Sequence, residues 1–190
     1  MSKNILVAIL CLALVGVMYF GVFRPTKSAN TTAILTIPST SLEESICENV
    51  TAQFGDCKKI LLFDNHSKLV FAQSSSGIVP VLTNSEFTEM KKFISPMMDF
   101  QEFREEKVER GHLDWRVNNH VQKDFSLIYG FAEDDVKTIV INSEGNVQPN
   151  RFYVHDNLWV WYAVIPKDKV ELPVEVMAYD DNGQKINGGE

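Results

Sequence analysis

The sequence LWVWYAVI, residues 158–165, is apolar along its whole length and holds no charged residue. Such a run is typical of a strand that is buried on both faces, near the middle of a sheet. Successive side chains of a strand point to opposite faces, so Trp159 and Trp161 are expected to share one face. We predict that the second half of the fold is built around this strand.

Short strand patterns surround this stretch, and no helical pattern separates them. Ser143-Glu144-Gly145-Asn146 and Asp180-Asp181-Asn182-Gly183 supply turns between these patterns. Several short strands joined by turns are typical of a small antiparallel sandwich, which we predict for residues 123–187. The strands expected around 158–165 are 126–131, 136–141, 151–154, 174–179 and 184–186.

Residues 41–122 are predicted to form an α+β subdomain, a small sheet flanked by helices. Ser41 and Glu44 have the spacing of a capping box, and apolar residues then recur at helical spacing as far as Gly55. Pro80 indicates that the third strand lies at a sheet edge. The strands expected here are 59–63, 68–72 and 78–82.

Two more helices are predicted after the third strand. Thr83 begins a possible capping box for a helix that runs to about Ile94. Pro96 suits the first turn of a helix that ends before Gly111. The polar stretch 112–123 is expected to form a weak strand and a loop.

The run ILVAILCLALVGVMYFGVF, from Ile5 to Phe23, contains no charge and no proline. At helical rise it spans about 28 Å, enough for a hydrocarbon core of roughly 30 Å. We predict an uncleaved transmembrane helix over residues 1–24, with a short cytoplasmic head, and a polar tether over 25–40. A cleaved signal peptide and a secreted protein are the alternative, although the run exceeds the usual signal core of about 7–15 residues. The bulk of the chain is expected outside the cytoplasm.

Acidic residues dominate the chain after the apolar run. Residues 1–41 contain three basic residues and no acidic one. The remainder therefore has 15 of the 18 basic and all 25 acidic residues, a net charge of −10. A surface of this charge repels nucleic acid, so no nucleic-acid partner is expected.

Three cysteines are present, and Cys11 lies within the apolar run. Cys47 and Cys57 are ten residues apart and fit a disulfide in an oxidising compartment. Two buried thiols are the alternative. No second Cys/His pair lies near them at metal-ligand spacing.

One polar cluster has the residue types of a metal or proton-transfer site. His112, Asp114 and His120, with Asp124 nearby, offer imidazole and carboxylate ligands. Their spacing matches no named metal motif, and ordinary loop residues are the alternative. No catalytic residue and no cofactor are predicted.

Aromatic side chains form the second candidate site. Trp159 and Trp161 share one strand face, and Tyr153 precedes them on the neighbouring predicted strand. An exposed aromatic face can stack on sugars or bind a partner. Packing within the core is the alternative.

The order GFAEDDVKTIVIN, LWVWYAVIP and PVEVMAYDDNGQ, between residues 130 and 184, resembles the Ig-like or fibronectin-like β-modules of bacterial surface proteins. The whole layout is similar to small uncharacterised membrane-anchored extracytoplasmic proteins of Bacillus-like bacteria. The cysteine pair of a true immunoglobulin core is missing, because no cysteine follows Cys57. The resemblance implies an exported, anchored and non-catalytic protein.

Two functions follow from these patterns. The first is a non-enzymatic envelope module that binds a protein or a cell-wall ligand. The second is a metal-dependent or hydrolytic envelope enzyme that uses His112, Asp114 and His120. An exposed aromatic patch would favour the first function, and a cleft lined by these three residues would favour the second.

Overall fold

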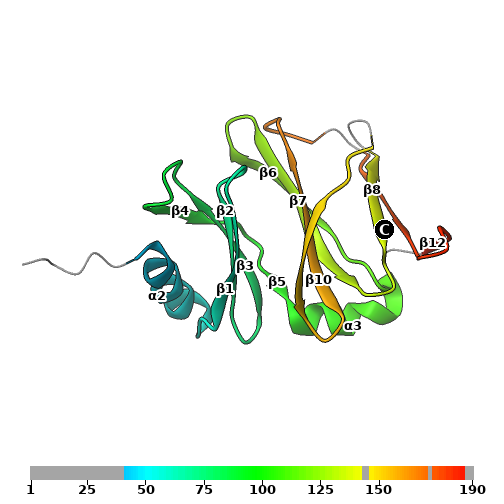
Figure 1. The fold of residues 1–190 in the computed structure, drawn as a ribbon, viewed down its shortest axis with the longest axis horizontal. Coiled ribbons are helices and arrows are strands. Elements are labelled where there is room, and N and C mark those ends of the chain that lie inside the picture. Colours follow the sequence, from blue (N-terminus) through cyan, green and yellow to red (C-terminus); the bar gives the residue numbers. More distant parts are fainter. Residues whose placement is uncertain (1–40, 143–145, 171–172, 187–190) are drawn as a thin grey trace, which may run out of the picture. The chain divides into compact units, whose positions relative to one another are not determined.

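A computed structural model of the chain describes residues 41–142, 146–170 and 173–186 (Figure 1). The predicted membrane anchor 1–24 and tether 25–40 lie outside the described residues. The described part is mostly β-structure, with antiparallel sheets and two helices. Neither of these two helices has both the length and the apolar character needed to span a bilayer.

The first sheet is formed by residues 59–99 and has the strand order β1-β2-β3-β4, with β5 also paired to β3. β2 and β3 are buried along their whole length. Helix α2 packs on one face of this sheet (Figure 1). The bounds are α2 Leu42–Phe54, β1 Lys59–Asp64, β2 Leu69–Gln73, β3 Gly77–Thr83, β4 Met90–Phe93 and β5 Met98–Asp99.

Helix α3 connects the first sheet to two further antiparallel sheets. The second sheet has the order β6-β7-β10-β9, and the third has the order β12-β11-β8. The bounds are α3 Phe100–Arg110, β6 Arg116–Gln122, β7 Phe125–Glu133, β8 Thr138–Asn142, β9 Asn150–His155, β10 Leu158–Ile165, β11 Glu175–Tyr179 and β12 Lys185–Ile186.

Strand β10 confirms the prediction of a central strand at 158–165. It pairs with β7 along its whole length and with β9 on its other side. Val160 and Tyr162 pack in the core between the first and second sheets. Trp161 and Ala163 point to the opposite face and pack in the core beneath the third sheet. The second sheet is therefore a middle layer with an apolar core on each side.

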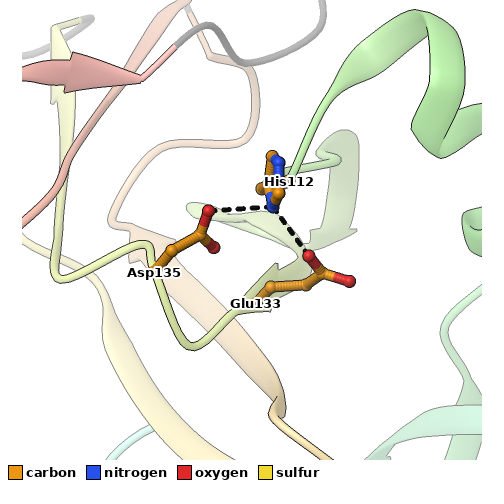
Figure 2. Close-up of side chains that lie close together, drawn as sticks. All are labelled: His112, Glu133 and Asp135. Carbon is orange, nitrogen blue, oxygen red and sulfur yellow. Dashed lines mark hydrogen bonds and ion pairs between the residues drawn. The ribbon is translucent and has the colours of Figure 1, made fainter.

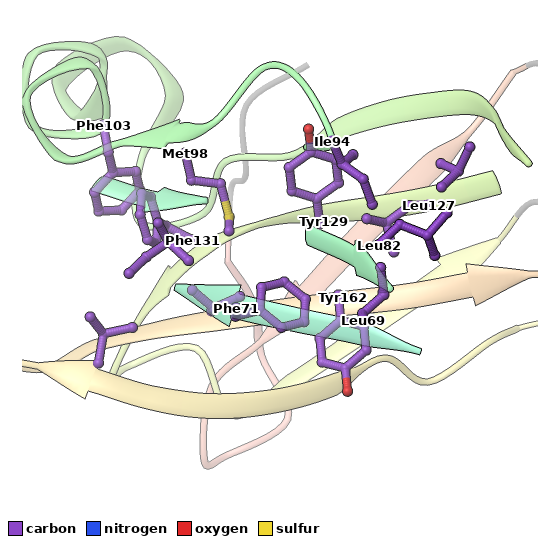
Figure 3. Packing of buried hydrophobic residues seen from close by; sticks show 14 of the residues in the cluster. Leu69, Phe71, Leu82, Ile94, Met98, Phe103, Leu127, Tyr129, Phe131 and Tyr162 are labelled. Atoms are coloured by element: carbon purple, nitrogen blue, oxygen red, sulfur yellow. The ribbon is translucent and has the colours of Figure 1, made fainter. Parts of the chain in front are cut away.

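The core between the first and second sheets takes residues from both sides of the boundary predicted after residue 122 (Figure 3). Phe71 of β2 lies 4.8 Å from Tyr162 of β10, measured between ring centroids. Phe103 of α3 lies 5.3 Å from Phe131 of β7. Because burial of each such side chain stabilises by roughly 1.5–3 kcal/mol, this core holds the two sheets together.

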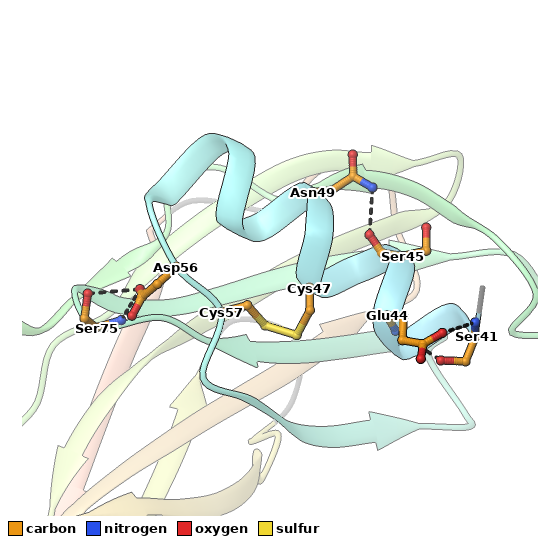
Figure 4. The surroundings of a disulfide bond; sticks show 8 residues. All are labelled: Ser41, Glu44, Ser45, Cys47, Asn49, Asp56, Cys57 and Ser75. Atoms are coloured by element: carbon orange, nitrogen blue, oxygen red, sulfur yellow. Dashed lines mark hydrogen bonds between the residues drawn. A yellow bond between two sulfur atoms is a disulfide. The ribbon is translucent and has the colours of Figure 1, made fainter.

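Helix α2 begins and ends as its sequence predicts. Ser41 and Glu44 form both hydrogen bonds of the capping box, and Gly55 follows the last helical residue. Cys47 and Cys57 form a disulfide, which confirms that prediction and ties the helix to the segment before β1 (Figure 4). Closing a loop of this length stabilises the fold by about 2–3 kcal/mol in the chain-entropy model.

The helix predicted from Thr83 to Ile94 is wrong. The Oγ1 atom of Thr83 donates to the backbone oxygen of Lys68, so it does not cap a helix. The Oδ1 atom of Asn84 accepts the backbone N–H groups of Thr88 and Glu89, which closes a turn. The chain then returns as β4, paired to β3. Side-chain hydrogen bonds of Asn and Thr compete with helix formation in this way.

The next helix starts later than predicted. Asp99 caps α3 by accepting the N–H groups of Gln101 and Glu102, whereas the sequence predicts a first turn that contains Pro96. Residues 98–99 are instead paired with the start of β3. Gly111 follows the last helical residue, as predicted.

Strand β3 is an interior strand, so the sheet edge predicted from Pro80 is also wrong. On one side β3 pairs with β2, and on the other side it pairs with β5 and β4 in turn. Pro80 lies between the residues that pair with β5 and those that pair with β4. A proline fits there because no ladder hydrogen bond requires its missing N–H group.

Candidate functional site

The structure gives the three predicted metal ligands separate partners. His112, between α3 and β6, lies beside Glu133 and Asp135. Asp114 is buried and pairs with Arg116. His120 lies near the far end of β6, is 66% exposed and has its Nδ1 atom 4.0 Å from Asp168. Among the described residues, only His112 of the predicted set belongs to a three-residue group with metal-ligand geometry.

Asp114 connects the segment before β6 to β7. One carboxylate oxygen lies 2.8 Å from the guanidinium of Arg116, and the other accepts the backbone N–H of Phe131. Burial raises the pKa of this carboxyl, and the Phe131 N–H and Arg116 act in the opposite direction. The side chain is 3% exposed and its acceptors are occupied, so its role is structural.

His112 lies between two carboxylates (Figure 2). Its Nδ1 atom is 2.7 Å from Oε2 of Glu133 and 2.8 Å from Oδ2 of Asp135. Glu133 is the last residue of β7, and its Oε1 atom accepts a hydrogen bond of 2.7 Å from Lys107 of α3. Imidazole and carboxylate groups in this arrangement can hold a cation or share a proton.

The three predicted aromatic residues divide into one buried and two accessible side chains. Trp161 is fully buried, and its indole N–H donates to the backbone oxygen of Phe131. Tyr153 is 51% exposed and Trp159 is partly buried. The two rings meet edge to face with their centroids 5.3 Å apart. Core packing therefore accounts for Trp161 but not for the other pair.

The position of β9 explains this exposure. Tyr153 is paired with Trp159, and Arg151 is paired with Trp161, so all four point to the face of the third sheet. Among the described residues, the core beneath the third sheet takes none from β9. Tyr153 and Arg151 therefore remain exposed and Trp159 is only partly buried, and we call these three residues the aromatic surface.

Arg151 belongs to the aromatic surface through two contacts. Its guanidinium carbon lies 5.1 Å from the centroid of the Trp159 ring, within the range of a cation–π interaction. It also donates a hydrogen bond of 3.1 Å to the backbone oxygen of Lys137. On the other side, the indole N–H of Trp159 donates to Asp134. These contacts hold the indole in one orientation.

A cleft of about 230 Å³ adjoins the aromatic surface. Trp159 and Trp161 supply aromatic lining, and Thr138 and Gln148 supply polar groups. Among the described residues of the lining, the ionised side chains are Lys137 and Arg151, and both are cations. The described residues that line this cleft are Ala132, Val136, Lys137, Thr138, Ile139, Gln148, Pro149, Arg151, Trp159 and Trp161.

A second cavity, of about 490 Å³, lies among α3, residues 73–75 and the turn between β9 and β10. Its lining mixes charges of both signs, with Arg104 and Glu133 among them. The Oε1 atom of Gln73 is buried here without a hydrogen-bond partner among the described residues. Glu133 thus contacts both this cavity and His112.

Sequence reasoning missed three residues of these sites. Arg151 could have been found, because it lies two positions before Tyr153 on a predicted strand and so shares its face. Glu133 and Asp135 could not, because they follow His112 by more than twenty residues. Their approach depends on how the segment after α3 pairs with β7, which no local pattern specifies.

No protein-family model, curated protein or solved structure matches this chain. The resemblance to Ig-like modules of bacterial surface proteins therefore stays a prediction. The chemistry assigned to the two sites depends on their residues and geometry alone.

Proposed function

We propose that this chain is a membrane-anchored, extracytoplasmic binding module of the cell envelope without catalytic activity. The segment from Ile5 to Phe23 is its single transmembrane anchor. The second and third sheets correspond to an Ig-like β-sandwich, and the aromatic surface on β9 and β10 binds the ligand. The ligand is a cell-wall polymer or an envelope protein.

The observation that carries this proposal is an edge-to-face pair of aromatic rings beside a cleft, with Tyr153 exposed and Trp159 only partly buried. Burying a ring such as Tyr153 would be favourable, yet the fold leaves it 51% exposed. Trp159 is oriented by Arg151 and Asp134, so little side-chain entropy remains to be lost when a ligand binds. Rigid aromatic groups of this kind commonly dominate the energy of recognition.

The charge of the cleft favours an anionic ligand. Lys137 and Arg151 are the ionised groups among the described residues of its lining, on a chain that carries more acidic than basic residues. A local positive potential on an acidic protein favours negatively charged ligands and disfavours positively charged ones. An anionic cell-wall polymer, with sugar or polyol groups to stack on Trp159 and Tyr153, fits this combination best.

The disulfide supports a location outside the cytoplasm. Disulfides persist in oxidising compartments and are rare where thiols are kept reduced. Cys47 and Cys57 are bonded, and the apolar run from Ile5 to Phe23 has the length of a membrane span. A chain with both features is suited to the envelope.

Binding to isolated bacterial cell-wall sacculi tests the proposal. The full chain in detergent micelles is expected to sediment with sacculi that carry their anionic polymers, and less so with stripped sacculi. Trp159→Ala and Tyr153→Ala are each expected to weaken this binding about tenfold or more, because they remove the stacking rings. Binding is also expected to weaken as salt is raised.

Phe63→Ala is the matched control variant. Phe63 is 41% exposed and contacts Phe87, over which Lys68 forms a cation–π contact, so it belongs to a similar exposed cluster on the first sheet. Its removal is expected to leave binding unchanged. The proposal of a cell-wall ligand fails if sacculi do not bind the chain, or if Phe63→Ala weakens binding as much as Trp159→Ala.

A metal-dependent or hydrolytic enzyme is the second candidate, and one observation favours it. Glu133 contacts His112 and also lines the cavity of about 490 Å³, so a molecule in that cavity would lie beside the cluster. Hydrolysis of a chromogenic ester or phosphate ester by the wild-type chain, lost in His112→Ala, would favour this function over binding alone.

A further inference from the structure

We propose that His112, Glu133 and Asp135 form a binding site for one divalent transition-metal ion, of which Zn²⁺ is the test case. Three ligand atoms from three residues lie within 4.8 Å of one another, namely Nδ1 of the imidazole and one oxygen of each carboxylate. Among the described residues, no other group of three His, Cys, Asp or Glu side chains does so.

The contacts at the imidazole nitrogen of His112 favour a metal ion over hydrogen bonds alone. Two carboxylate oxygens approach the same Nδ1 atom, at 2.7 Å and 2.8 Å (Figure 2). That nitrogen carries at most one hydrogen, which can make only one well-aligned hydrogen bond. A metal ion between the three atoms would satisfy both carboxylates and the nitrogen lone pair together.

Backbone hydrogen bonds around the cluster hold its three ligands in place. Glu133 N–H donates to the backbone oxygen of His112, and Asp114 N–H donates to that of Phe131. Val136 N–H donates to the oxygen of Glu133 and closes the turn that contains Asp135. A site whose ligands lie at a strand end, in a tight turn and in a segment bonded to that strand needs little reorganisation to bind an ion.

The distances require only a small opening of the cluster. Zinc binds nitrogen and oxygen ligands at about 2.0–2.2 Å, which in tetrahedral geometry places neighbouring ligand atoms about 3.3 Å apart. Each contact must therefore lengthen by about half an ångström. Asp135 lies in a turn and is 46% exposed, so it can make this movement.

The type of ligands selects the ion. Calcium and magnesium prefer sites made of oxygen atoms, whereas an imidazole nitrogen favours zinc and similar transition metals. Lys107 hydrogen-bonds Oε1 of Glu133 and leaves Oε2 directed at His112, which is how a supporting residue orients a carboxylate ligand. Three protein ligands leave at least one coordination position for water or another molecule.

Zinc titration of the full chain in detergent micelles, against a chromophoric chelator, tests the site. Cys11→Ser is used as the background, and Cys47 and Cys57 are kept oxidised, so that no thiol binds the ion. One Zn²⁺ per chain is expected, and Ca²⁺ is expected not to compete. His112→Ala and Asp135→Asn are each expected to weaken binding about tenfold or more.

His120→Ala is the matched control, because His120 is also an exposed histidine beside an aspartate, Asp168, but within the described part of the chain it belongs to no group of three metal-ligand side chains. The His120→Ala chain is expected to bind zinc with the same affinity as the background chain. Circular dichroism checks that each variant is folded, and Glu133→Gln replaces any variant that is not. The proposal is overturned if the background chain binds no zinc stoichiometrically, or if His120→Ala weakens binding as much as His112→Ala.

Discussion

Replacing Gly130 by alanine is expected to lower the free energy of unfolding by about 3 kcal/mol or more. Gly130 lies in β7 opposite Trp161, where the backbone of Asp114 passes over it. An added Cβ would overlap the backbone oxygen of Asp114 and lie 2.8 Å from its carbonyl carbon. Because these are backbone atoms of a residue whose N–H donates to the backbone oxygen of Phe131, they cannot turn aside as a side-chain end would.

Gly183→Ala provides the comparison for Gly130→Ala in urea denaturation. Gly183 has a φ of +74° but no heavy atom near the position of an added Cβ. Its replacement is expected to cost only the backbone strain of the left-handed region, about 1–2 kcal/mol. The account of Gly130 is wrong if its variant is no less stable than Gly183→Ala.

Asp114→Ala is expected to destabilise the protein by about 3–5 kcal/mol, the range for one removed partner of a buried ion pair. The change leaves the guanidinium of Arg116 without its nearest anion and the N–H of Phe131 without its acceptor. Asp114→Asn keeps a hydrogen-bond acceptor and is expected to lose less stability than Asp114→Ala. Urea denaturation of the two variants measures both effects.

Asp168→Ala is the control for the loss of an acidic group at an exposed position. Asp168 is 65% exposed and lies 4.0 Å from His120, so its removal is expected to cost at most about 1 kcal/mol. Equal stability losses in Asp114→Ala and Asp168→Ala would contradict a structural role for the buried carboxylate.

The elements with strong local signals could be predicted from the sequence. The capping box and apolar stripe of α2 depend on residues within one helix, and the glycine after it marks its end. The run 158–165 indicated a strand buried on both faces, because only such a strand excludes polar residues from both. The proximity of Cys47 and Cys57 likewise made their disulfide predictable.

The errors arose where tertiary contacts decided between local alternatives. Thr83 and Glu86 fit a capping box, but Thr83 donates to Lys68, just before β2, and Asn84 closes a turn. Pro80 indicated an edge strand, yet two short strands share that side of β3 and leave a gap at the proline. Neither outcome could be predicted from a short stretch of sequence, because each depends on contacts with other strands.

The candidate sites were likewise predictable where the signal lay within one strand, and not where it depended on tertiary contacts. Alternation along one strand placed Trp159 and Trp161 on one face, but how far the third sheet covers that face decides which ring is buried. The partners of His112 are the last residue of β7 and a residue of the turn that follows, and they reach His112 through a strand pairing that local patterns do not encode. The residue type was enough to suggest His112 as a metal ligand. The other two ligands could be identified only from the folded structure.

The central claim, that this is an exported envelope module, is tested most directly by thiol labelling of intact cells that produce the Cys11→Ser chain. A membrane-impermeant maleimide is applied before and after denaturation, with and without reductant. We predict that Cys47 and Cys57 label only after reduction, and that intact cells expose both once a reductant is added. Labelling of both cysteines on denaturation without reductant would contradict the claim, because the pair would then be reduced and the domain would face the cytoplasm.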